Sequence, residues 1–152
     1  MLFRSLMHHV KLQPRQALYF GAGNVHAYLG GTGLEVMASS DNVVRAAFTQ
    51  KKVDIDEFLH VARMAPISSP IVEAVQQEPG IWNYPVETQR FAAQRIDVTA
   101  NHNVRASHNA EILVCTAGDA GALNKGQAAV LRTGETITLS GNATVFRVWG
   151  TR

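Results

Sequence analysis

The residues best suited to chemistry lie between Gly21 and Asp54, where one histidine, one arginine and a lysine pair stand among small and apolar residues. The alternating segment Val25-His26-Ala27-Tyr28 predicts a strand on which His26 and Tyr28 point to the same face. A neutral imidazole on such a strand, inside a small barrel, suits zinc or iron. The alternative is a structural histidine with its own hydrogen-bond partners. A catalytic metal needs about three protein ligands, and this stretch offers one obvious candidate.

Two kinds of cation follow His26 in the same stretch. The guanidinium of Arg45 has a fixed charge and a fork of donors, which suit a phosphate or a developing enolate oxygen. The alternative for Arg45 is an ion pair with Asp41 or Glu35. Lys51 and its neighbour Lys52 would act as point charges, and by themselves they are typical of solvated surface.

Glu35 is a carboxylate in an apolar setting, within Gly33-Leu34-Glu35-Val36-Met37. Partial burial would raise its pKa and suit it to proton transfer near neutral pH. A buried ion pair is the competing interpretation.

The remaining chemically active side chains are interpreted as structural or exposed. His8 and His9 are adjacent, so on a strand they would face opposite sides and would not share one metal. Three further histidines are interpreted as surface residues: His60 on a short helix, and His102 and His108 in a polar loop. Cys115 follows the apolar run Ile112-Leu113-Val114 and is predicted to be a buried structural thiol.

Strands and one helix are predicted to position these residues. Short apolar runs broken by turn residues between Val10 and Leu29 predict two or three strands. Asp54 followed by Glu57 predicts a helix start, and the helix is expected to end before Pro66. Further strands are predicted over Phe91–Val98, Ala110–Ala117, Ala128–Leu131, Thr136–Leu139 and Thr144–Trp149. Many short strands at near-regular spacing favour a sandwich or a barrel.

The segment between these two groups of strands is rich in proline, which predicts a connection between two units. We therefore expect three parts: residues 1–65 with a first β unit and the short helix, residues 66–85 as the connection, and residues 86–152 as a second β unit.

A weak internal repeat supports two similar β units. When residues 12–20 are laid over residues 131–139, the turn and apolar positions coincide. After a one-residue deletion Asn24 meets Asn142, and His26 meets Thr144. The alternative is that any two strand-turn-strand segments look alike. If the repeat is real, only the first unit keeps a metal-binding side chain.

Composition excludes several classes of protein. The net charge of +2 is spread along the chain without the basic stripe of a nucleic-acid binder, so no nucleic-acid partner is expected. No stretch approaches the roughly 18 apolar residues of a membrane helix, and the N-terminal segment lacks the apolar run of a secretory signal. The expected location is the cytoplasm, without a membrane partner.

With these residues in place, the sequence resembles the C-terminal part of the type I mannose-6-phosphate isomerases. The resemblance rests on Asn24-Val25-His26-Ala27-Tyr28-Leu29, on the run from Glu35 to Arg45 with its Ser-Asp-Asn-Val-Val-Arg segment, and on the lysine after Phe48-Thr49. It continues through Glu111-Ile112-Leu113 and residues 131–135, and so covers nearly the whole chain.

The resemblance implies a mainly β fold, with a cupin-like (jelly-roll) barrel, part of a second, catalytic cupin barrel and one short helix. It also implies zinc-dependent interconversion of mannose 6-phosphate and fructose 6-phosphate. Carried over by position, His26 would be a zinc ligand, Arg45 the catalytic arginine, and Glu35 and Lys51 substrate-binding residues. Arg15 stands where the family commonly has a turn glycine, and Gln50 where it commonly has a proline.

The main departure from the family pattern is a missing set of ligands. Members supply their other zinc ligands, a Gln-x-His pair and a glutamate, from an upstream region, and no Gln-x-His occurs in this sequence. The leading hypothesis is a C-terminal portion of such an isomerase, with the missing N-terminal part as a possible partner and an incomplete zinc site. The alternative is a non-catalytic cupin-like module that binds a sugar phosphate or a partner chain.

Overall fold

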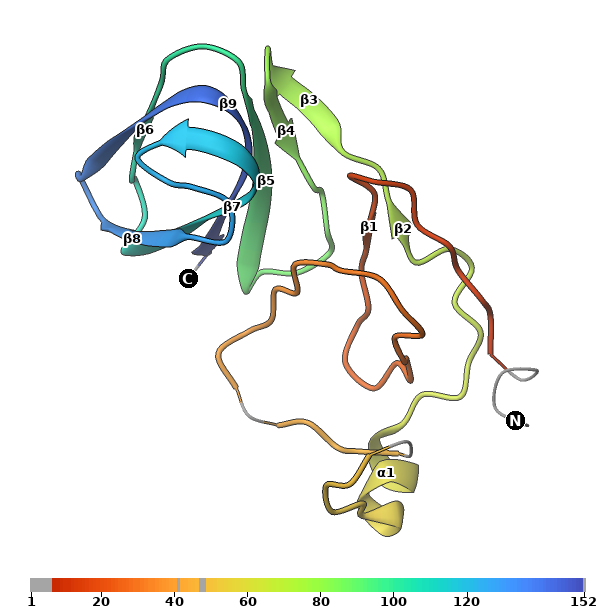
Figure 1. The fold of residues 1–152 in the computed structure, drawn as a ribbon. Helices are drawn as coiled ribbons and strands as arrows, with labels where there is room; N and C mark the ends of the chain where they lie inside the picture. Colours follow the sequence, from red (N-terminus) through yellow and green to blue (C-terminus); the bar gives the residue numbers. More distant parts are fainter. Residues whose placement is uncertain (1–6, 41, 47–48, 152) are drawn as a thin grey trace.

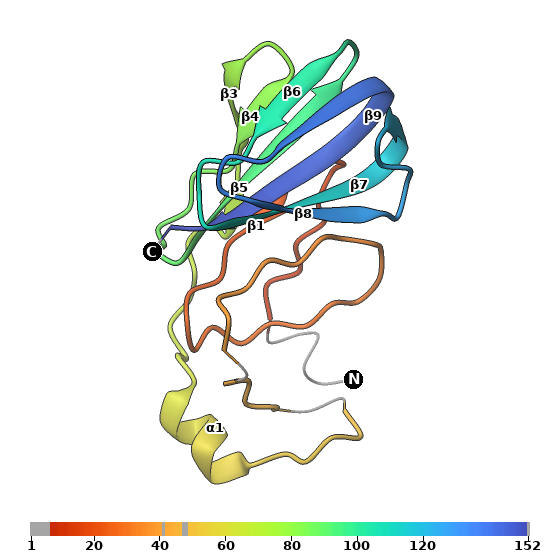
Figure 2. The same cartoon turned by 90° about the vertical axis from the view of Figure 1, so that its left-hand side faces the viewer.

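The computed structural model of the chain describes residues 7–40, 42–46 and 49–151. It is mainly β with one short helix, as predicted, and its strands are all antiparallel. Figures 1 and 2 show a rolled sheet formed by the C-terminal residues, beside a long N-terminal segment that winds through extended loops.

The rolled sheet has seven strands. They are β3 (Val75–Glu78), β4 (Ile81–Asn83), β5 (Phe91–Val98), β6 (His102–Arg105), β7 (Ala110–Gly121), β8 (Ala128–Arg132) and β9 (Thr136–Gly150). Their order is β3-β4-β5-β9-β7-β8, and β6 pairs with the first part of β9. The long β9 therefore pairs with three strands along its length, which lets the sheet roll around one core.

Side-chain alternation along β7 and β9 builds that core. Leu113, Cys115 and Val145 point inward and are fully buried, while Ile112, one residue away from Leu113, is 46% exposed. The buried thiol of Cys115 was predicted, and burial raises its pKa. The apolar side chains along this part of β7 and β9 are what the sequence pattern indicated.

The last strand differs from its prediction, because β9 is one continuous strand and not two strands with a turn at Gly141. Gly141 has a φ of 99°, and a Cβ on it would lie 2.7 Å from the carbonyl oxygen of Asp119. The register between β7 and β9 shifts here, between Asp119 and Gly121. The glycine therefore serves a bulge that bends the strand, and not a reversal of the chain.

The helix α1 (Ile55–Val61) begins as predicted and ends earlier than Pro66. The Asp54 side chain accepts a hydrogen bond from the Glu57 backbone N–H at 3.1 Å, which is the expected N-cap. None of its residues is buried, and Ile55 and Leu59 are more than 60% exposed. Among the described residues no helix is long and apolar enough to cross a membrane.

The strands predicted between Val10 and Leu29 are mostly absent. This region contains β1 (Ala17–Leu18), which pairs with β2 (Ile71–Val72), and one bridge between Asn24 and Arg63. A strand needs a neighbour for its backbone hydrogen bonds, and the two-residue β2 is the only strand that pairs with this region within the described part of the chain. The short strands β2, β3 and β4, in the proline-rich segment, were not predicted.

The turns of the proposed repeat have the same geometry. In one turn the Gln16 N–H donates to the Gln13 carbonyl at 3.1 Å, and the Gln13 N–H donates to the Gln16 side chain at 2.9 Å. In the other, Glu135 and Arg132 form the same two bonds at 3.0 and 2.8 Å. Arg15 and Gly134 occupy matching positions with φ of 76° and 87°. The repeat is therefore supported at its turn, although not over the strands that follow.

This turn predicts an unusual effect of glycine. A left-handed conformation costs a residue with a side chain roughly 1–2 kcal/mol, so replacing Arg15 by glycine removes this cost from the folded state. The greater conformational freedom of glycine in the unfolded chain offsets part of the stability gained. Arg15→Gly loses a 3.9 Å ion pair with Asp97, but the arginine is largely exposed and such pairs contribute little. Urea unfolding is expected to show Arg15→Gly about 0.5 kcal/mol more stable than the wild type. Arg132→Gly, in strand β8, is the matched control and should be destabilising; equal losses in both variants would contradict the prediction.

Candidate functional site

His26 is held by a turn that packs against the end of α1. The Arg63 N–H donates to the Gly23 carbonyl at 2.8 Å, and a Cβ on Gly23 would lie 2.6 Å from the Val61 carbonyl oxygen. Gly23 has a φ of 82°, so both its conformation and this close approach favour glycine. The residues after the turn, including His26, are thereby fixed relative to the helix.

Two aromatic rings and one carbonyl surround the His26 imidazole. The ring stacks on Phe20 with 4.7 Å between centroids, and the Tyr28 ring meets it edge-on at 6.0 Å. Nδ1 lies 2.9 Å from the Asn24 carbonyl oxygen. Because a carbonyl oxygen only accepts, Nδ1 carries the hydrogen and donates it, which leaves the Nε2 lone pair for a metal. His26 is exposed. The prediction that it lies in a strand is wrong.

Tyr28 connects His26 to Glu35. The Tyr28 hydroxyl donates a hydrogen bond to Glu35 Oε1 at 2.9 Å. Partial burial, the hydrogen bond and the carboxylate charge all raise the pKa of Tyr28, so the phenol stays protonated. The expectation of a partly buried Glu35 is wrong: the residue is exposed, and the described residues around it form no strand. The structure thus brings His26, Tyr28 and Glu35 together.

Arg45 and Lys51 are exposed residues of the same stretch. In the described ranges Arg45 forms no ion pair, so the alternative of a bridge to Glu35 is not realised. The other suggested partner, Asp41, lies outside the described residues. The Lys51 backbone N–H donates to the Thr49 hydroxyl at 3.1 Å, and the residue is exposed. No contact recorded among the described residues joins these two cations to the His26 cluster.

The described residues contain no group of three side chains of the kinds that could hold a metal ion. His26 has the tautomer of a metal-bound imidazole, but one imidazole does not make a zinc site. The residues present therefore fit zinc as a single contributor and not as a complete site. No reaction step is assigned to a metal on these residues.

A second polar cluster, not predicted from the sequence, lies inside the rolled sheet. The Glu111 carboxylate is fully buried and accepts hydrogen bonds from Arg147 Nε at 2.5 Å, His108 Nδ1 at 2.9 Å and the Ser107 N–H at 2.8 Å. Arg147 also donates to the Arg105 carbonyl at 3.1 Å. Trp149 packs beside this cluster, with its ring 5.0 Å from the His108 ring and 5.2 Å from the Arg147 guanidinium.

The structure corrects two predictions of surface histidines. His108 is held by Glu111, and His102 belongs to strand β6 and is half-buried. The sequence carried one signal for the cluster. Glu111 precedes the inward-facing Leu113 and Cys115 by two and four residues, so alternation places its carboxylate in the core. A carboxylate there requires a buried cation or several donors.

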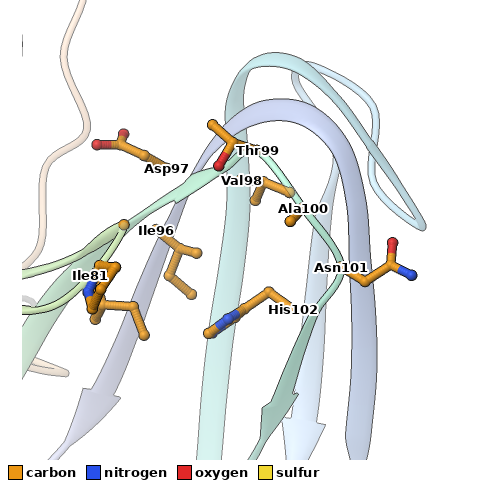
Figure 3. A pocket seen from close by; sticks show the side chains of 10 residues that line it. Ile81, Ile96, Asp97, Val98, Thr99, Ala100, Asn101 and His102 are labelled. Atoms are coloured by element: carbon orange, nitrogen blue, oxygen red, sulfur yellow. The ribbon is translucent and has the colours of Figure 1, made fainter.

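The structure also contains a cavity at the β4–β6 end of the rolled sheet, of about 320 Å³. Figure 3 shows the His102 ring directed toward Ile81 and Ile96, while the side chains of Asp97 and Asn101 point away from them. Because Asp97 and Asn101 point away, few polar groups of this lining are directed at one ligand, and the cavity offers little for recognition of a polar molecule.

The comparisons with solved structures define the fold. The chain matches a mutant phosphomannose isomerase from Salmonella typhimurium with a TM-score of 0.61 and 24% identity, over 75% of this chain and 32% of that one. It also matches mannose 6-phosphate isomerase from the same organism, bound to fructose 6-phosphate and zinc, with a TM-score of 0.53 and 26% identity over 76% of this chain. The chain therefore has the fold of part of a sugar-phosphate isomerase.

Comparison with known protein sequences finds mannose-6-phosphate isomerases as relatives. Mannose-6-phosphate isomerase of Escherichia coli is 33% identical over 147 residues, which are 95% of this chain and 37% of that protein. Mannose-6-phosphate isomerase 1 of Arabidopsis thaliana is 40% identical over 90 residues, or 59% of this chain. No protein-family model matches. The chain is a relative of the mannose-6-phosphate isomerases, as the resemblance predicted, and it spans just over a third of the length of the Escherichia coli protein.

Proposed function

We propose that this chain supplies one wall of a site that interconverts mannose 6-phosphate and fructose 6-phosphate. The observation that carries the proposal is the similarity to mannose-6-phosphate isomerases over 95% of the chain. The chain matches 37% of the Escherichia coli relative. In this proposal the opposite wall of the site is therefore formed by residues like those in the rest of that protein. The partner in this proposal is an N-terminal part of the kind that such isomerases contain.

The roles of the four site residues follow from their chemistry and surroundings. Arg45, exposed and without an ion pair among the described residues, is the catalytic arginine that meets the developing oxyanion of the sugar. Lys51 binds the phosphate as a point charge. Glu35, oriented by the Tyr28 hydroxyl, binds the substrate. His26 contributes Nε2 as one ligand of the zinc that the Salmonella relative holds.

The proposal keeps the three predicted parts of the chain. Residues 1–65 carry the catalytic wall and the helix, residues 66–85 lead from them into the rolled sheet and supply its strands β3 and β4, and residues 86–152 form the rest of this cupin-like unit. A cytoplasmic location and the lack of a nucleic-acid partner remain predictions from the sequence.

A chimera tests the proposal. In the Escherichia coli relative, the 147-residue region matched by this chain is replaced by this chain, and isomerisation of mannose 6-phosphate is measured with added zinc. The chimera is expected to turn over substrate, while this chain alone and the Escherichia coli protein without the region are expected to be inactive. A folded chimera without activity, or a fully active isolated chain, would overturn the proposal.

The alternative function is a non-catalytic module that binds a sugar phosphate or a partner chain. One observation favours it: the rolled sheet closes its own core, whereas the proposed catalytic wall is exposed. A metal-free monomer that binds mannose 6-phosphate without converting it, together with an inactive chimera, would support this alternative.

A further inference from the structure

The rolled sheet has a second cavity, of about 490 Å³, at its polar end. Asn83, Gln94 and Arg147 form one row across β4, β5 and β9 and therefore point to the same face. His108 and Trp149 also line the cavity. At the other end of the sheet the inward side chains, such as Val98 and Leu139, are apolar and fully packed. The interior thus opens at one end into a polar cavity, and barrel mouths are common ligand sites.

The polar groups of this cavity are held in place before any ligand arrives. Gln94, which is 93% buried, donates from Nε2 to Asn83 Oδ1 at 3.0 Å. Asn83 in turn donates to Gln77 Oε1 at 2.7 Å. The Arg147 guanidinium is fixed at two of its three nitrogens, by Glu111 and by the Arg105 carbonyl. Groups with fixed positions lose little freedom on binding, which favours recognition.

The charges in the cavity indicate the chemical class of the ligand. Glu111 is fully buried behind Arg147, and the two opposite charges offset each other. The cavity therefore has no unpaired arginine of the kind that phosphate sites use. It offers amide donors and acceptors, which match hydroxyl groups, and the ring of Trp149, which matches an apolar C–H surface.

We propose that this cavity binds a neutral polyhydroxylated molecule of monosaccharide size, with Asn83, Gln94 and Arg147 on its hydroxyl groups and Trp149 against its carbon skeleton. The volume lies within the range of about 300–1,000 Å³ that small-molecule sites occupy. This site is separate from the stretch between Gly21 and Asp54, so it does not depend on the proposed isomerase function.

The experiment uses the full chain and D-mannose as the probe, with inorganic phosphate as the second probe. Calorimetric titration is expected to show saturable binding of D-mannose and none of phosphate. Trp149→Leu should weaken D-mannose binding at least tenfold. Trp82→Leu is the matched control, because Trp82 stacks on Arg95 and does not line this cavity, and it should bind as the wild type does.

Chemical shifts of the wild-type chain keep the test independent of how well Trp149→Leu folds. D-mannose is expected to shift the side-chain signals of Asn83, Gln94 and Trp149, and to leave His26 unchanged. Three results would overturn the proposal: no saturable binding of D-mannose, shifts confined to the His26 region, or binding of phosphate in this cavity. The last would assign the cavity to anions, and none of the three bears on isomerisation by the chimera.

Discussion

Glu111→Gln is expected to destabilise the folded chain by about 3–5 kcal/mol, the range measured when one partner of a buried ion pair is removed. The substitution keeps the shape of the side chain, so it creates no cavity. The amide cannot accept hydrogen bonds on both of its ends, and it leaves the Arg147 guanidinium, largely buried, without a counter-charge. The expected loss of stability therefore comes from the lost charge and hydrogen bonds, and not from lost packing.

The same carboxylate predicts how stability depends on pH. Burial by itself raises the pKa of Glu111, but the hydrogen bonds from Arg147, His108 and the Ser107 and His108 amides outweigh burial and lower the pKa to about 2. A carboxyl whose pKa is lower in the folded state stabilises that state at pH above its unfolded value of 4.5. This stabilisation, about 3 kcal/mol, is lost as pH falls from 4.5 toward 2.

Urea unfolding between pH 7 and pH 2 measures both effects. The wild type should lose stability below pH 4.5, and Glu111→Gln should be less stable at pH 7 with a flatter dependence below it. Glu87→Gln is the matched control, because the residue is exposed and, among the described residues, its hydrogen bond from the Tyr19 hydroxyl is accepted by the backbone carbonyl and not by the side chain. A Glu111→Gln variant within about 0.5 kcal/mol of the wild type at pH 7, the usual scatter for surface substitutions, would remove the proposed role of the buried pair.

Arg45→Ala in the chimera is expected to lower kcat/KM about a hundredfold or more, the usual loss when one donor to a developing oxyanion is removed. Arg45 lies in a stretch without strands, so the substitution removes a charged group and little packing. Arg45→Lys keeps the charge but loses the planar fork of donors, and should recover only part of the activity.

Steady-state kinetics of the chimera with mannose 6-phosphate provide the measurement. Arg90→Ala is the control, because this exposed arginine makes its recorded contacts through the backbone. Equal activity of the Arg45→Ala and wild-type chimeras would contradict the catalytic role. A rise in KM with an unchanged kcat would assign Arg45 to ground-state binding and not to catalysis.

The strands of the rolled sheet were largely predictable, because alternation there coincides with real burial. Phe91–Val98 was predicted with its observed bounds, and the buried position of Cys115 followed from its apolar neighbours. The bounds failed at glycines such as Gly141, where a positive φ serves a bulge that the sequence does not distinguish from a turn.

The N-terminal strands were not predictable in the same way. Apolar runs between Val10 and Leu29 have strand-like composition, but within the described part of the chain only Ala17–Leu18 pairs with another strand, Ile71–Val72. A strand forms where a neighbour supplies hydrogen bonds, and the identity of that neighbour is a tertiary property.

The candidate site residues also differ in whether their contacts are local in sequence or join distant strands. His26 and Tyr28 were expected on the same face of a strand, and Glu35 was predicted separately as a partly buried carboxylate. The structure joins them without that strand, by contacts from His26 to Tyr28 and from Tyr28 to Glu35. The pairing of Glu111 with Arg147 joins residues 36 positions apart on neighbouring strands. Alternation along the strand could have indicated that Glu111 needs a buried partner, but not which residue would be that partner.

Zinc retained by the purified chimera tests most directly whether this chain forms one wall of a metal-dependent isomerase site. After dialysis, metal analysis is expected to find about one zinc ion per chain in the wild-type chimera, and a large loss of zinc in His26→Gln. His60→Gln, which changes an exposed histidine on α1, should retain the metal. Equal zinc content in His26→Gln and the wild type would contradict the assignment of His26, and with it the proposed catalytic wall.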